Sequence, residues 1–160
     1  MKVDASTPGG IKSPMSEEYA NARAASRYAT DYILRWVEIA NEVHGSDLLY
    51  ALVFTTLWAG NCSHIRGGLY AEIDEVPPDH ERRPLTVRQV ADSLGLPYEK
   101  VRRRFVEMLE KGMAQRVGRE GFIVPHAALA KPEVLHGLRR SHQSLTRFLK
   151  DLKSIGIEAA

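Results

Sequence analysis

The chain has 160 residues, of which 44% are apolar and 26% are charged, as in an average soluble globular protein. This composition excludes a collagen-like chain and disorder of the whole chain, and the single cysteine, Cys62, excludes a disulfide scaffold. The length suits one domain, or a small domain with helical extensions.

Neither a targeting signal nor a membrane span is visible in the sequence. Residues 1–10 contain one lysine and no apolar run, unlike a secretory signal. The longest apolar stretch, Leu48 to Gly60, has 13 residues, whereas a membrane helix needs about 18. We therefore expect a cytoplasmic protein without a membrane partner, and the lone cysteine fits a reducing compartment.

The net charge of +2 is unevenly distributed along the chain. Residues 82–119 carry ten basic and four acidic side chains, a net of +6, whereas residues 67–81 carry five acids and no Lys or Arg. A short segment with concentrated positive charge favours a nucleic-acid partner. The alternative is an ordinary solvated surface.

Two helices are predicted in the N-terminal third. The first begins at Ser16, which can cap it, and runs to Gly45 without a Gly or Pro. Its apolar face comprises Ala29, Ile33, Trp36, Val37, Ala40 and Val43. The second begins after Ser46-Asp47, runs over 48–65 and is closed by Gly67-Gly68. It is apolar nearly all round, which predicts a central, buried helix.

The segment after the proline-bearing acidic loop predicts two short helices joined by a tight turn. Thr86 and Gln89 form a capping box, and Gly95 ends the first helix. Pro97 suits the first position of the second helix, which Gly112 ends. The inner faces are expected to comprise Val87, Val90, Ala91 and Leu94 in the first helix and Val101, Phe105, Met108 and Leu109 in the second.

This run, residues 85–105, resembles the helix-turn-helix of the winged helix family of bacterial transcription regulators. Residues 113–117 and 122–124 read as strands around a turn at 118–121, in the place of that family's wing. The resemblance implies a mainly α fold with a small β-hairpin wing and sequence-specific binding of double-stranded DNA. The alternative is a winged-helix adaptor that binds protein and not DNA.

The resemblance places the second helix in the major groove of DNA. With Val101 and Phe105 inward, a step of 100° per residue turns Glu99, Lys100 and Arg103 outward. We expect Arg103 to read a guanine, and Glu99 either to accept from a cytosine or to pair with Arg103. The remaining candidates for contacts with base edges or phosphates are Thr86, Arg88, Tyr98, Lys100, Arg102, Arg104 and, at the wing tip, Arg119, with Arg82 and Arg83 at the approach to the first helix.

A final helix is predicted from Pro132-Glu133. Its leucines recur in alternating steps of three and four, a seam comprising Leu135, Leu138, His142, Leu145, Leu149 and Leu152. The seam favours a homodimer, although a helix packed on its own domain is the alternative. The order of the elements is similar to that of MarR-type regulators, whose N- and C-terminal helices interlock as a dimer. The long acidic loop and long first helix depart from that pattern, so GntR-, IclR- and other winged-helix relatives stay open.

These patterns divide the chain into a disordered tail (1–15), a helical N-terminal region (16–66), an acidic loop (67–83), a winged helix-turn-helix region (84–125) and a C-terminal helix (126–160). No catalytic motif is present, and we expect no enzyme activity, no cofactor and no metal site. An aromatic set can either line a pocket for an unknown small-molecule effector or form core: Trp36, Tyr50, Phe54 and Trp58. A third hypothesis is a metal or small-ligand enzyme built on the helical part, which stoichiometric metal would support.

Overall fold

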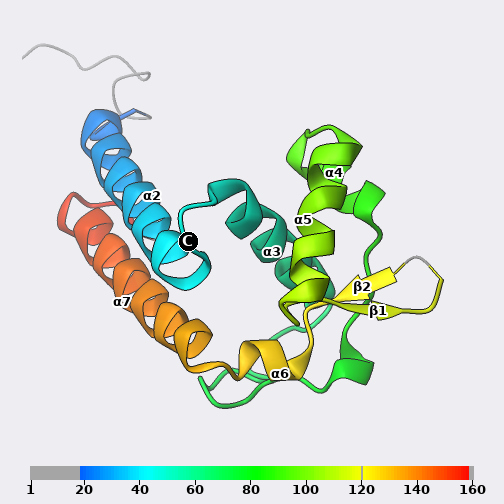
Figure 1. Ribbon diagram of the computed structural model, residues 1–160. Helices are drawn as coiled ribbons and strands as arrows, with labels where there is room; N and C mark the ends of the chain where they lie inside the picture. The colour runs from blue at the N-terminus through cyan, green and yellow to red at the C-terminus, as the bar shows by residue number, and fades with distance from the viewer. Residues whose placement is uncertain (1–18, 120, 159–160) are drawn as a thin grey trace, which may run out of the picture.

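The structure, a computed structural model, describes residues 19–119 and 121–158 and is mainly helical with one small antiparallel hairpin (Figure 1). Its elements are α2 (Ala22–His44), α3 (Leu48–Asn61), the 3-10 turn η1 (Asp79–Glu81), α4 (Val87–Leu94), α5 (Tyr98–Glu110), β1 (Gln115–Val117), β2 (Gly121–Ile123), α6 (His126–Leu129) and α7 (Pro132–Ser154). The helix α6 is absent from the sequence prediction. The predicted tail (1–15) and the predicted helix start at Ser16 lie outside the described residues.

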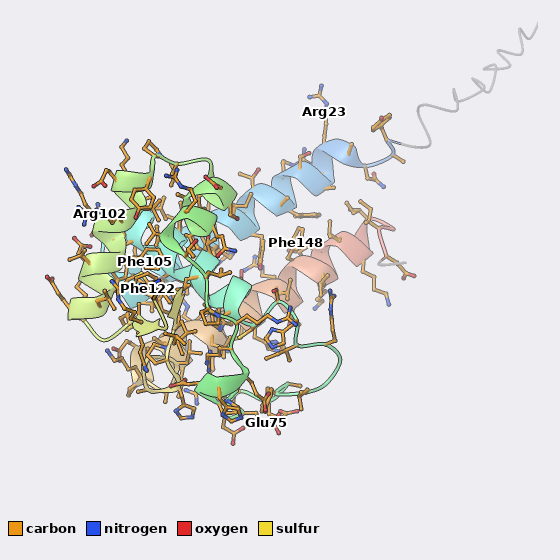
Figure 2. The ribbon with its side chains drawn as sticks, turned by 90° about the vertical axis from the view of Figure 1, so that its right-hand side faces the viewer. Arg23, Glu75, Arg102, Phe105, Phe122 and Phe148 are labelled. Carbon is orange, nitrogen blue, oxygen red and sulfur yellow. The ribbon has the colours of Figure 1, made fainter. Side chains whose placement is uncertain are left out.

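The chain forms a helical body and a two-helix arm (Figure 1). The arm consists of α2 and α7, which lie side by side and run in opposite directions. The body contains α3, α4, α5 and the hairpin. Figure 2 shows Phe148 between the two arm helices and Phe105 and Phe122 inside the body.

The helix α3 lies at the centre of the body, as its apolar sequence predicts. Val53 and Leu57 are fully buried in one cluster with residues of α4, α5 and β2. Its start is confirmed, because Asp47 accepts a hydrogen bond from the Tyr50 amide. The helix ends at Asn61, four residues before the predicted end. After Asn61 the backbone switches to shorter turns, in which the Cys62 and Ser63 amides both donate to Gly60 O.

The two short helices form as their end signals predict. Thr86 and Gln89 make both hydrogen bonds of the capping box. Gly95 adopts φ 63°, a left-handed conformation that glycine reaches without strain. Pro97 immediately precedes α5 and is not its first residue. Val101, Phe105 and Met108 form the buried face of α5.

The hairpin is confirmed, although β1 begins two residues later than predicted and β2 is shifted one residue toward the N-terminus. Gln115, Arg116 and Val117 pair with Ile123, Phe122 and Gly121, respectively. On its other side, Phe122 exchanges two backbone hydrogen bonds with Leu85, immediately before α4, at 2.8 and 3.0 Å. The segment before α4 is therefore joined to the hairpin by an isolated β-bridge.

The structure corrects the prediction that Arg82, at the end of the acidic loop, contacts DNA. Its side chain is buried, so it is not a contact for DNA. The guanidinium donates to Pro77 O at 2.6 Å and forms an ion pair with Asp79 (Nε–Oδ1 3.5 Å). Arg82 therefore holds together the part of the loop that contains Pro77 and Asp79. The loop contains one short element of regular structure, the 3-10 turn η1.

Among residues 19–119 and 121–158, no helix is both long enough and apolar enough to cross a bilayer.

Candidate nucleic-acid interface

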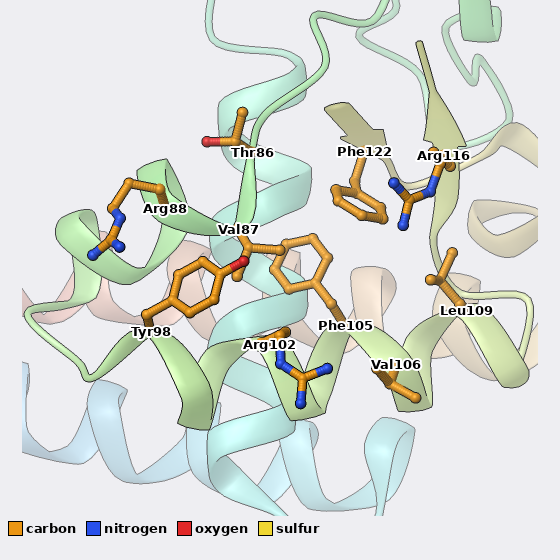
Figure 3. A pocket seen from close by; sticks show the side chains of 10 residues that line it. All are labelled: Thr86, Val87, Arg88, Tyr98, Arg102, Phe105, Val106, Leu109, Arg116 and Phe122. Carbon is orange, nitrogen blue, oxygen red and sulfur yellow. The ribbon is translucent and has the colours of Figure 1, made fainter. Parts of the chain in front are cut away.

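A cleft of about 450 Å³ lies between the start of α4, one side of α5 and the hairpin (Figure 3). Its floor is apolar, because Val87, Phe105 and Phe122 come from the buried core. The complete lining comprises Thr86, Val87, Arg88, Tyr98, Arg102, Phe105, Val106, Leu109, Arg116 and Phe122.

Three guanidinium groups surround the cleft, each from a different element (Figure 3). Arg88 of α4 lies over the Tyr98 ring, 4.8 Å from its centroid. Arg102 of α5 bonds Glu99 through Nε (3.0 Å to Oε2). Arg116 of β1 lies over the Phe122 ring at 4.9 Å and donates to the Arg119 carbonyl at 3.0 Å. Each guanidinium group therefore contacts an aromatic ring or a hydrogen-bond acceptor at the rim of one opening.

The start of α4 adds backbone donors to this rim. The first amides of a helix, here those of Val87 and Arg88, have no carbonyl partner within the helix. Thr86 uses its side chain to cap the Gln89 amide, so its hydroxyl is already engaged in the helix start. Amides at a helix start and adjacent guanidinium groups together favour an anionic ligand, such as a phosphate.

The outer face of α5 presents the predicted base-reading residues to solvent. Glu99, Lys100 and Arg103 are all exposed. Glu99 pairs with Arg102, three residues on, and not with Arg103. Among the ion pairs of the described residues, none involves Arg103 or Lys100. Arg103 and Lys100 are therefore the basic side chains of this face whose charge no acid of the described residues pairs with.

Arg104, predicted to contact phosphate, lies on a different side of α5. Its guanidinium pairs with Asp47 (Nη2–Oδ2 2.9 Å) and with Glu107 (Nη1–Oε1 3.3 Å). Asp47 also caps α3, so this pair ties α5 to α3 inside the body. We therefore leave Arg104 out of the interface. Arg119 lies exposed in the hairpin turn, and Arg83 is exposed before α4.

The sequence analysis missed Arg116 as a residue of this cleft. The signal available in the sequence is its position in the predicted strand, where hairpin pairing sets it opposite Phe122. It also missed Asn61, which is fully buried and joins α3 to the root of the hairpin. A single asparagine in an apolar helix gave no indication of those partners.

The other candidate sites of the sequence concern metal ligands, the cysteine and the aromatic set. The described residues contain no group of three or more His, Cys, Asp or Glu side chains arranged to hold a metal. Burial raises the pKa of the Cys62 thiol, which favours its unreactive protonated form. Of the aromatic set, Tyr50 and Phe54 are buried in the core, whereas Trp58 lies at the surface.

His44 makes stability depend on pH. Its ring packs on Phe54 (centroids 4.5 Å apart), and burial together with the Lys111 charge lowers its pKa to about 4 from the ordinary 6.5. Between these values the unfolded chain binds more protons, so the free energy of unfolding falls as the pH drops from 6.5 to 4. Because the ring stays partly exposed, we expect a loss of about 1–2 kcal/mol. Urea unfolding across this range measures it.

The matched variants are His44→Phe and His136→Phe, since His136 is exposed on α7. The His44 variant is expected to flatten the pH dependence, and the His136 variant to leave it as in the wild type. An equal pH dependence in both variants would show that His44 does not cause it.

Comparison with known proteins assigns neither a family nor a function to the chain. No protein-family model matches the sequence, and neither a curated protein nor a solved structure matches the chain.

Proposed function

We propose that this chain is a winged helix-turn-helix protein that binds double-stranded DNA sequence-specifically, as a transcription regulator. Three features support the fold: the α4–turn–α5 unit, the hairpin that follows it, and the β-bridge between Leu85 and Phe122 that joins them. The observation that carries the function is the cleft, where Arg88, Arg102 and Arg116 surround the start of α4 beside the exposed face of α5.

Each part of the interface has a distinct role in this proposal. The helix α5 lies in the major groove, where Arg103 offers its two-pronged guanidinium to the O6 and N7 acceptors of a guanine. The cleft receives the phosphate backbone at the groove's edge, which positions the protein without reading sequence. The hairpin is the wing, and Arg119 in its turn reaches phosphate or the minor groove.

The charge of the interface favours DNA over a protein partner. The affinity of a protein for duplex DNA rises with each basic side chain that displaces a counterion from a phosphate. Clustered guanidinium groups therefore favour binding to a duplex. A protein-binding adaptor does not require three arginines around one cleft. We assign no catalytic step, cofactor or metal to this proposal.

Binding of the wild-type chain to random-sequence duplexes, measured against salt concentration, tests the proposal. We expect affinity to fall steeply as salt rises, with a slope set by the number of phosphates contacted. Selection from a random duplex library then gives the preferred site. Absence of duplex binding at low salt, or affinity insensitive to salt, would exclude DNA and favour the adaptor.

A further inference from the structure

Val106 is a large apolar side chain on the outer face of α5, where it is 41% exposed. It precedes the buried Met108 by two residues, as Arg103 precedes the buried Phe105. A step of two residues turns a side chain by 200° around a helix. Val106 and Arg103 therefore lie on the same side of α5, opposite the core of the body.

The charges along α5 show which part of this face suits a duplex. Residues 98–104 contain four basic side chains and one acid, whereas residues 105–110 contain two acids and no Lys or Arg. The first half of the helix is therefore the part that the phosphates on either side of a groove attract. Val106 follows this half by two residues, and Figure 3 shows its side chain one turn along α5 from Arg102, at the edge of the cleft.

A valine binds a different kind of group from its charged neighbours. Its side chain neither donates nor accepts a hydrogen bond, and it gains free energy only from contact with apolar groups. In the major groove, base pairs present hydrogen-bond donors, hydrogen-bond acceptors and one apolar group, the C5 methyl group of thymine. The phosphate oxygens offer acceptors only. Among the groups that a duplex presents to the outer face of α5, the thymine methyl is therefore the one that suits Val106.

We propose, on the basis of the proposed function, that Val106 contacts the C5 methyl group of a thymine close to the guanine that Arg103 reads. Residues three positions apart in a helix are separated by about 4.5 Å along its axis. Successive bases of a strand are separated by about 3.4 Å. The thymine therefore lies within two base pairs of the guanine. Val106 adds to Arg103 a second contact that depends on the base sequence.

The test uses the duplex selected from the random library, with each thymine replaced in turn by deoxyuridine. Uracil keeps the pairing and the O4 acceptor of thymine and lacks only the methyl group. We expect one replacement, within two base pairs of the position whose preference is relaxed in Arg103→Ala, to lower the affinity of the wild type about fourfold. This loss corresponds to one buried methylene group. Fluorescence anisotropy at constant salt measures the affinities.

Val106→Ala and Val117→Ala are the matched variants, since Val117 is 38% exposed in β1, outside α5. We expect the Val106 variant to bind the thymine and uracil duplexes equally, because alanine is too short to reach the methyl group. We expect the Val117 variant to keep the fourfold difference. Each comparison is a ratio of two affinities of one protein, so a smaller folded fraction in a variant does not produce the result.

Equal affinity of the wild type for the thymine duplex and all of the uracil duplexes overturns the proposal for Val106. A selected site without a thymine within two base pairs of the guanine overturns it as well. A difference that persists in Val106→Ala assigns the methyl contact to another residue and also overturns it. In these three results the wild type still binds a duplex, so the proposed function stands. Absence of any duplex binding instead removes the proposed function, and the role of Val106 with it.

Discussion

Asn61→Leu is expected to lower the free energy of unfolding by about 3–5 kcal/mol. Asn61 is fully buried, and its Nδ2 donates to the carbonyls of Arg83 (2.7 Å) and Phe122 (3.1 Å). Its Oδ1 accepts from the Val124 amide at 2.9 Å. Leucine fills the space but leaves these backbone groups buried with fewer partners, which is more costly than losing an exposed hydrogen bond. Urea unfolding measures the change.

Two further variants interpret that result. Asn41→Leu makes the same change at an exposed site of α2, where we expect a difference within about 0.5 kcal/mol. Asn61→Asp keeps an acceptor for Val124 but sets a carboxylate against two carbonyls, so it is expected to destabilise at neutral pH and to recover in part in acid. Equal unfolding midpoints for Asn61→Leu and Asn41→Leu would show that the buried hydrogen bonds contribute little.

Replacing Arg88, Arg102 and Arg116 together with alanine is expected to lower the affinity for duplex DNA by about 100-fold, or roughly 1 kcal/mol per arginine. This result rests on the proposed function. Because the cleft holds phosphates, the loss is expected to be similar for all sequences, and the slope of log affinity against log salt is expected to fall by about three. Fluorescence anisotropy with two unrelated duplexes measures both quantities.

The control replaces three exposed arginines outside the cleft, Arg23, Arg27 and Arg66, and so makes the same change in net charge. We expect only a small effect from it. Arg103→Ala is the contrasting variant: it is expected to relax the preference at one base pair by about 1–3 kcal/mol. If the triple variant in the cleft and the triple control variant weaken binding equally, binding depends on the net charge of the protein, and the cleft is not a phosphate site.

Local signals in the sequence were sufficient for most element ends. Asp47, Thr86 and Gly95 act through hydrogen bonds or backbone conformations within a few residues, so the sequence alone reveals them. The α4–α5 pair and the hairpin were predicted for the same reason. The cleft itself was not predicted, although two of its three arginines, Arg88 and Arg102, are among the candidate contacts named from the sequence.

Long-range partners could not be predicted in this way. Asn61 bonds residues 22, 61 and 63 positions further along the chain, and only folding brings them together. Arg104 has the same charge and helix as Arg103, but its pairing with Asp47 of a distant segment changes its role. Arg82 is basic and next to the helix-turn-helix, but its side chain is buried and bonds Pro77 and Asp79. Residue type alone therefore does not distinguish Arg82, Arg103 and Arg104. Their tertiary contacts do.

The pairing of Leu85 with Phe122 has a consequence for target selection under the proposed function. It joins the start of α4 to the hairpin, and Phe122 in turn contacts Phe105 of α5 (ring centroids 4.9 Å apart). The distance between the groove-reading helix and the tip of the hairpin is therefore fixed by the protein. A duplex must adapt its own curvature and groove width to meet both, so stiff and pliable base steps are discriminated even where no side chain contacts them.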